Sequence, residues 1–250
     1  MKIHLLICCF ILNLNCNTDK PILEETEITD TETPKEIIEE VENTPNPQKK
    51  YKILALGDSY TIGQSVCETC RFPEQLKSKL ENNIANSEIS LDVIAQTGWT
   101  TTNLQTAINS NNPSNDFDLV TLLIGVNNQY QNKAFSIYEA EFPQLLSKAI
   151  ALAKGKSSKV IVISIPDYAY TPFGQSSSNS GTISQQLDLY NNFAETYSKE
   201  NNVTFINITD ITRNGLSNPE LVASDGLHPS QLAYSKFVER LLPLAIEKLD

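Results

Sequence analysis

The sequence predicts an α/β protein: a three-layer α/β/α sandwich around a five-stranded parallel sheet of the flavodoxin-like kind. From residue 51 onward, short apolar runs alternate with longer segments of helical periodicity. The short runs are apolar at successive positions, which is typical of parallel strands covered on both faces. Five such runs occur, and their helices can cross over both faces of the sheet they form.

Each element follows from local residue patterns. The first strand is expected over residues 52–56 and ends at Gly57, and the next helix is expected over residues 72–84, where Phe72, Leu76 and Leu80 recur at helical spacing. Thr100 or Thr101 caps the helix expected at 101–108. The other expected strands are 91–95, 119–124, 160–165 and 203–206, and the other expected helices are 134–153, 183–200 and 230–248. Ligands of such folds bind beyond the carboxyl ends of the strands.

The first sixteen residues are expected to be a signal peptide. Lys2 precedes an apolar run over residues 3–12 that only His4 interrupts, and this run is shorter than the about 20 residues of a membrane-spanning helix. Cys16 follows directly, so we expect cleavage before it and lipidation of its thiol. The preceding residue is Asn15 rather than Gly, Ala or Ser, which leaves an ordinary signal peptide cut elsewhere as the alternative.

Residues 17–50 are expected to be an acidic, disordered tether before a single domain over residues 51–250. The segment carries ten acidic and four basic side chains, with scattered Pro and Thr and no sustained apolar period. The whole chain has a net charge of −11, which argues against nucleic-acid binding because that requires clustered Lys and Arg. The same negative charge disfavours electrostatic docking on anionic lipid, so contact with a membrane is expected only through an N-terminal lipid anchor.

The candidate catalytic residues lie at the two ends of the domain. Ser59 follows the first strand in Gly57-Asp58-Ser59, and His228 is the one histidine outside the predicted signal peptide. Asp225 stands three residues before His228, where its carboxylate can orient the imidazole as a base for the serine hydroxyl. The structural alternative is that these residues form ordinary turns and helix caps.

Two further positions can hold an oxyanion. Gly98 follows the second predicted strand and Asn127 follows the third. The backbone N–H groups of Ser59 and Gly98 and the side-chain amide of Asn127 supply three donors, as the intermediate of ester hydrolysis requires. Taken singly, each position is more simply explained by a strand-end turn or, for Asn127, an Asx-turn.

These positions together resemble the SGNH hydrolases, also called the GDSL-type esterase and lipase superfamily. The resemblance implies the fold of that family, a nucleophilic Ser59, a base at His228 oriented by Asp225, and an oxyanion hole from Ser59, Gly98 and Asn127. It spans nearly the whole domain, through Gly57-Asp58-Ser59, Gly98, Gly125-Val126-Asn127 and Asp225-Gly226-Leu227-His228.

Two features stand beside this resemblance. The family's third motif usually ends in Asp, where this chain has Asn128, and we expect the change to alter loop hydrogen bonding rather than catalysis. Cys67 and Cys70 form a C-x-x-C pair that in the cytosol would suggest redox chemistry or half a zinc site. Export favours a disulfide that stiffens the loop after the nucleophile, with a reduced pair as the alternative.

The expected activity is hydrolysis of short-chain acyl esters through an acyl-enzyme, with no metal or organic cofactor. The resemblance implies substrates among the family's esters, and the lack of a long apolar lid favours short-chain ones such as acetylated glycans or lysophospholipid-like esters. Tyr168, Tyr170 and Phe173 follow the fourth strand, where they can line an acyl or sugar pocket or serve as ordinary loop packing. Two alternatives stay open, an O-acyltransferase and a glycan-binding module that keeps the fold without turnover.

Overall fold

The computed structural model describes residues 47–176 and 180–250. The predicted signal peptide, Cys16 and all but the last four residues of the predicted tether lie outside the described residues. Within the described part of the chain, none of the helices is long and apolar enough to span a membrane.

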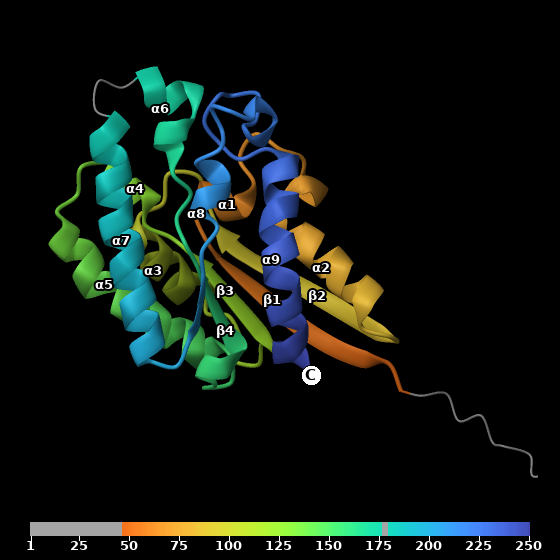
Figure 1. Cartoon of the computed structure of the whole chain (residues 1–250). Coiled ribbons are helices and arrows are strands. Elements are labelled where there is room, and N and C mark those ends of the chain that lie inside the picture. The colour runs from red at the N-terminus through yellow and green to blue at the C-terminus, as the bar shows by residue number, and fades with distance from the viewer. Residues whose placement is uncertain (1–46, 177–179) are drawn as a thin grey trace, which may run out of the picture. The chain divides into compact units, whose positions relative to one another are not determined.

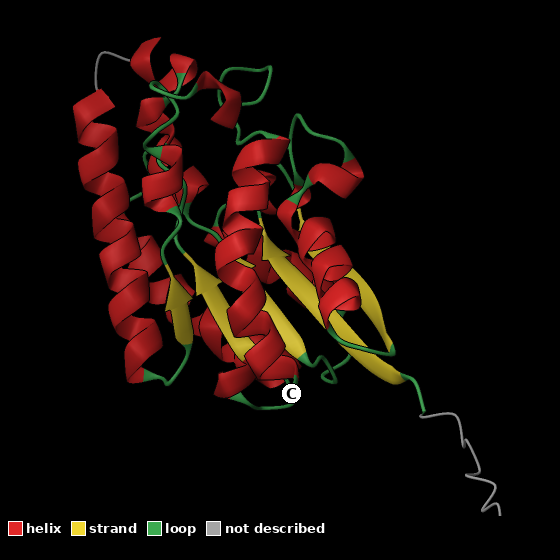
Figure 2. Ribbon diagram, turned by 45° about the vertical axis from the view of Figure 1, so that its right-hand side comes forward, coloured by secondary structure: helices red, strands yellow, loops and turns green. Residues whose placement is uncertain are grey.

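Five parallel strands form one sheet in the order β2-β1-β3-β4-β5 (Figures 1 and 2). All arrows point to the same end of the sheet, so the carboxyl ends of the strands share one edge. The predicted flavodoxin-like sheet is therefore confirmed. The strands are β1 (Lys49–Gly57), β2 (Ser87–Ala95), β3 (Leu119–Leu123), β4 (Val160–Ile163) and β5 (Thr204–Ile206).

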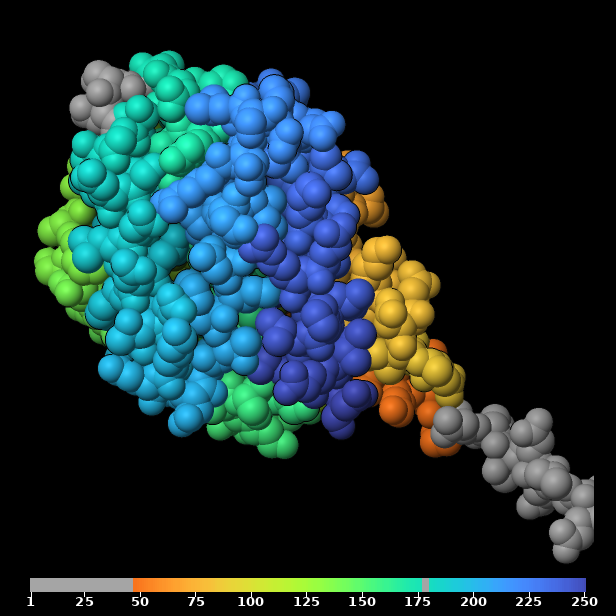
Figure 3. Space-filling view, viewed as in Figure 1, coloured from red at the N-terminus to blue at the C-terminus, as the bar shows by residue number. Residues whose placement is uncertain are grey.

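Helices cover both faces of the sheet, as continuously buried strands require. Helices α2 and α9 pack side by side on one face, and α3 and α5 pack together on the other, where α7 also contacts α5 (Figure 1). In the space-filling view, α9 and α2 lie over much of the sheet (Figure 3). The main helices are α2 (Phe72–Asn83), α3 (Thr101–Asn111), α5 (Phe135–Leu152), α7 (Ser180–Glu200) and α9 (Gln231–Leu249).

Shorter helices connect these layers, mostly at the carboxyl edge of the sheet. They are α1 (Ser59–Ile62), α4 (Val126–Tyr130), α6 (Pro172–Ser176) and α8 (Thr209–Thr212), with 3-10 turns η1 (Glu68–Cys70), η2 (Ser157–Lys159), η3 (Tyr168–Tyr170) and η4 (Pro219–Leu221). Aromatic rings join α5 to α7: the ring centroids of Tyr138 and Tyr190 lie 4.6 Å apart, and those of Phe135 and Tyr190 4.9 Å apart.

Two strands begin earlier than the sequence predicts. β1 starts at Lys49, two residues before the predicted domain, and β2 starts at Ser87 instead of residue 91. The two pair residue by residue over nine positions. β2 lies at the edge of the sheet, so its first half alternates exposed polar residues with the buried Ile89 and lacks a continuous apolar run.

Candidate active site

Ser59 is held at the first position of helix α1, directly beyond the end of β1. The sequence suggested a loop here, but Asp58 starts a short helix by accepting the backbone N–H of Tyr60 at its Oδ1 (3.0 Å). Gly57 allows the sharp turn because a Cβ at this position would lie 2.1 Å from Oγ1 of Thr61 and 2.5 Å from the carbonyl oxygen of Leu123. The serine is 4% exposed. Strand, glycine and cap thus present Ser59 at the carboxyl edge of the sheet.

His228 and Asp225 lie in the loop between η4 and α9. Nδ1 of His228 lies 2.6 Å from Oδ2 of Asp225. The other carboxylate oxygen, Oδ1, accepts the backbone N–H groups of Leu227 (2.9 Å) and His228 (3.0 Å). The loop is closed by the N–H of Ala223, which donates to the carbonyl of His228 (2.7 Å). An imidazole that donates its Nδ1–H to a carboxylate has Nε2 free to accept a proton.

The carboxyl groups of Asp225 and Asp58 have pKa values that are shifted in opposite directions. Partial burial would raise the pKa of the Asp225 carboxyl, but hydrogen bonds from Ser65, His228 and backbone N–H groups outweigh burial and hold that pKa well below its usual range. Burial raises the pKa of Asp58 to about 7, although the backbone N–H of Tyr60 partly offsets it. Asp225 is thus the ionised partner of His228, and Asp58 carries a proton part of the time at neutral pH.

Four of the predicted site residues meet in one cavity of about 240 Å³, and Asp225 stands behind them in contact with His228. Ser59, Gly98, Asn127 and His228 all line it, although they come from four separate segments of the chain. Apart from His228, the described residues that line this cavity include no Asp, Glu, Lys or Arg. The remaining lining residues are Tyr60, Thr97, Val126, Tyr130, Tyr168, Phe173 and Leu227.

The oxyanion candidates are fixed by contacts between neighbouring loops. Gly98 has a φ of +86°, a left-handed conformation that favours glycine. The side-chain amide of Asn127 donates to the carbonyl oxygen of Trp99 (3.0 Å), and that of Gln131 donates to the carbonyl oxygen of Gly98 (3.0 Å). An amide nitrogen carries two hydrogens, so one N–H of Asn127 orients the side chain while the other can face the cavity. Gln131 was not singled out from the sequence, because no spacing pattern indicates its contact.

Asn128 joins helix α4 to the start of helix α3. It is fully buried; its Oδ1 accepts the backbone N–H of Thr101 (3.0 Å) and its Nδ2 donates to Oγ1 of Thr101 (2.7 Å). The Thr101 hydroxyl also contacts the Glu141 carboxylate from α5, to which it can donate. An aspartate at position 128 would compete with Glu141 for that hydroxyl, so the amide here suits this pairing.

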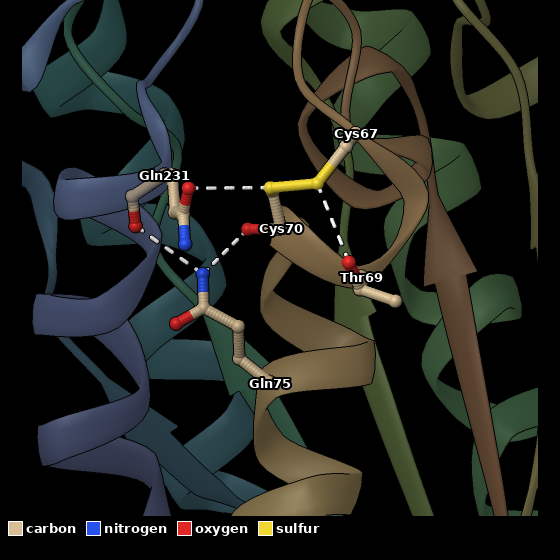
Figure 4. The surroundings of a disulfide bond; sticks show 5 residues. All are labelled: Cys67, Thr69, Cys70, Gln75 and Gln231. Carbon is tan, nitrogen blue, oxygen red and sulfur yellow. Dashed lines mark hydrogen bonds between the residues drawn. A yellow bond between two sulfur atoms is a disulfide. The ribbon is translucent and has the colours of Figure 1, made fainter.

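Cys67 and Cys70 form a disulfide beside the site (Figure 4). Gln75 on α2 donates both to the carbonyl oxygen of Cys70 (2.5 Å) and to that of Gln231 at the start of α9 (3.2 Å). Sγ of Cys70 lies 3.3 Å from Oε1 of Gln231. The disulfide-closed loop is thus attached to the helix that directly follows the His228 loop.

Three aromatic side chains form one wall of the cavity. Tyr130, Tyr168 and Phe173 lie with ring centroids 6.0 to 6.5 Å apart, and Tyr130 and Phe173 are 52% and 39% exposed. Tyr168 is anchored by its hydroxyl, which donates to Oε1 of Gln129 (2.8 Å). Tyr170, considered with Tyr168 and Phe173 from the sequence, is not among the cavity-lining residues. Tyr130 was missed because it lies on α4, far from them in the sequence.

No group of three or more His, Cys, Asp or Glu side chains among residues 47–176 and 180–250 is placed to hold a metal ion. The cavity is lined by a serine hydroxyl, an imidazole, a side-chain amide and aromatic rings.

The chain is similar to known proteins in its sequence and in its fold. Residues 55–236 match the model of the GDSL-like Lipase/Acylhydrolase family. A variant of an acetyl xylan esterase from Geobacillus stearothermophilus superposes with a TM-score of 0.59 at 17% identity, over 80% of this chain and 96% of that chain. A lipase/acylhydrolase from Enterococcus faecalis superposes with a TM-score of 0.57 at 21% identity, over 80% and 97%. No curated protein matches the sequence.

Proposed function

We propose that this chain, which belongs to the GDSL-like Lipase/Acylhydrolase family, is a serine esterase that acts through an acyl-enzyme on short-chain acyl esters. The observation that carries the proposal is the single cavity that Ser59, His228, Gly98 and Asn127 line together. Nucleophile, base and oxyanion donors that face one space are what acyl transfer needs.

In the proposed mechanism, Nε2 of His228 takes the proton of Ser59 while Oγ attacks the ester carbonyl. The backbone N–H groups of Ser59 and Gly98 and the amide of Asn127 donate to the oxyanion. The tetrahedral intermediate collapses as the His228 imidazolium gives its proton to the leaving alcohol, which leaves Ser59 acylated. Water, activated by the same imidazole, then attacks the acyl group and releases the carboxylic acid. Asp225 stabilises the imidazolium in both halves.

The cavity supports a small, uncharged substrate. Its volume of about 240 Å³ falls below the roughly 300–1,000 Å³ of pockets that take drug-sized ligands. None of the described residues that line it is a Lys or Arg that could bind a phosphate. Exposed aromatic rings at Tyr130 and Phe173 suit the apolar face of a sugar ring. We therefore favour acetylated glycans over lysophospholipid-like esters, and one structurally similar protein is named an acetyl xylan esterase.

The test is hydrolysis of p-nitrophenyl esters of two to twelve carbons, run beside acetylated xylan. We expect the acetyl ester and the xylan to be hydrolysed and kcat/KM to fall as the acyl chain lengthens. Ser59→Ala should lose at least about a thousandfold in kcat. Wild-type protein that hydrolyses no ester but binds the glycan would refute the proposal in favour of a binding module. Acylated sugar products in the presence of a sugar acceptor would indicate an O-acyltransferase.

We also propose that the protein is exported and anchored through a lipid on Cys16. The support is the charged and apolar pattern of residues 2–12 and the cysteine that follows it. Metabolic labelling with a fatty-acid analogue should mark wild-type protein and leave Cys16→Ser unlabelled. Labelling of the variant would refute the anchor.

A further inference from the structure

We propose that Ser65 is a positioning residue for the Asp225–His228 pair, an inference that rests on the proposed esterase function. Oγ of Ser65 donates to Oδ2 of Asp225 at 2.6 Å. Nδ1 of His228 lies 2.6 Å from the same oxygen. Ser65 thus shares with the imidazole the carboxylate oxygen that orients the base, although it lies 160 residues away in the sequence.

The contact complements those that Asp225 makes within its own loop. The backbone N–H groups of Leu227 and His228 hold only Oδ1. Hydrogen bonds to Oδ1 alone allow the carboxylate plane to tilt, so its orientation depends on the partners of Oδ2. The Ser65 hydroxyl supplies a second, fixed partner there, so Oδ2 stays directed at Nδ1 when the imidazole moves during proton transfer.

The conformation of the backbone around Ser65 holds this hydroxyl against Asp225. Ser65 has a φ of +68°, a left-handed conformation that costs a non-glycine residue free energy and persists only when its surroundings enforce it. The backbone N–H groups of Gly63 and Gln64 both donate to the carbonyl oxygen of Ser59 (3.1 and 3.0 Å). The nucleophile's own helix therefore fixes one side of Ser65.

The disulfide fixes the other side. Cys67 is bonded to Cys70, and Gln75 holds Cys70 against Gln231 at the start of α9, as Figure 4 shows. The segment that carries Ser65 is therefore attached to Ser59 before it and to the helix after His228 beyond it. Ser65 is the point at which this segment contacts the carboxylate of the site.

The electrostatic consequence is specific. A donor on Oδ2 withdraws negative charge from the oxygen that faces the imidazolium. The His228 ring has the Asp225 carboxylate and the ring of Tyr60, with centroids 5.9 Å apart, as its neighbours. Loss of the Ser65 hydroxyl should leave more negative charge on Oδ2, which strengthens its attraction to the imidazolium. Loss of the orientation that Ser65 gives to Oδ2 acts in the opposite direction, because a carboxylate turned away from Nδ1 stabilises the imidazolium less.

The test compares Ser65→Ala and Ser65→Gly with Thr69→Ala in the full-length chain. Glycine relieves the left-handed backbone while it removes the hydroxyl, so a loss of activity in that variant does not come from backbone strain. Thr69 is an exposed hydroxyl in the same loop whose contact is to Sγ of Cys67 (3.4 Å), and it serves as the matched control. We expect both Ser65 variants to lose about three- to tenfold in kcat on p-nitrophenyl acetate with KM unchanged. Thr69→Ala should behave like wild type.

A second measurement does not depend on turnover. Titration of the His228 ring followed by NMR should move away from the wild-type midpoint in both Ser65 variants and stay at that midpoint in Thr69→Ala. An unchanged midpoint in the Ser65 variants, or a wild-type kcat in Ser65→Gly, overturns the role of Ser65. If wild type hydrolyses no ester, the esterase proposal fails, and the NMR titration alone decides whether Ser65 acts on Asp225.

Discussion

Asp58 makes a sharp prediction about stability and pH. Burial raises the pKa of this fully buried carboxyl from 3.8 to about 7, so the folded protein holds the Asp58 proton more tightly than the unfolded chain does. Its contribution to stability is greatest below pH 3.8 and declines as the pH rises to about 7. The shift spans about 3 pH units at about 1.36 kcal/mol each, which gives about 4 kcal/mol.

The perturbation is Asp58→Asn, which cannot ionise but keeps an Oδ1 acceptor for the N–H of Tyr60. The unfolding free energy of the variant minus that of wild type should therefore rise by about 4 kcal/mol from pH 4 to pH 8. A stability change that the new amide causes equally at every pH does not alter this rise. Urea unfolding at four or five pH values across this range measures it, with the m-value as a check on two-state behaviour.

The control is Asp210→Asn. The hydrogen bonds from Arg240 lower the pKa of Asp210. Its contribution is fully present above the unfolded pKa and is lost only as the pH falls through the lower, folded pKa. Between pH 5 and 8 the Asp210→Asn curve should therefore run parallel to that of wild type. If the Asp58→Asn curve also runs parallel to wild type over that range, the burial argument for Asp58 is wrong.

Three further predictions concern the site and its supports. Asn127→Ala should lose about 100- to 1,000-fold in kcat with little change in KM, as stopped-flow and steady-state assays would show; an unchanged kcat would remove Asn127 from the oxyanion hole. Replacing both Cys67 and Cys70 by serine should cost about 2 kcal/mol of unfolding free energy, because the disulfide closes a very short loop; a loss above about 4 kcal/mol in urea would contradict this. Asn128→Asp should cost about 1–3 kcal/mol, and adding Glu141→Gln should restore much of it, because the glutamine amide can donate to the shared threonine hydroxyl. Additive losses in that double variant would refute the shared-hydroxyl explanation.

Local patterns predicted the parts of the site that depend on local geometry. Asp225 and His228 are three residues apart, so a single turn brings carboxylate and imidazole together without help from the rest of the chain. Ser59 follows a strand whose apolar run is unmistakable. The strand-end rule then accounts for why Ser59, Gly98 and Asn127 line the same cavity, since the carboxyl ends of parallel strands share one edge.

Contacts between distant segments were beyond such patterns. Ser65 meets Asp225 across 160 positions, and nothing about a serine in an exposed loop indicates a left-handed backbone or a partner. Gln131 and Tyr130 likewise act through neighbours that only the folded chain provides. The early start of β2 was missed for a related reason: its pairing with β1, rather than its own hydrophobicity, keeps residues 87–90 extended.

The direction of β1 has a consequence for how the molecule can be held. The strand enters the sheet at Lys49 and delivers the chain to Ser59 about 25–30 Å further on, at the opposite rim. An attachment upstream of Lys49 would therefore hold the domain at the end of the sheet opposite the cavity. If the proposed lipid anchor holds the chain from that end, the attachment does not cover the cavity, and a polymeric ester can still reach it.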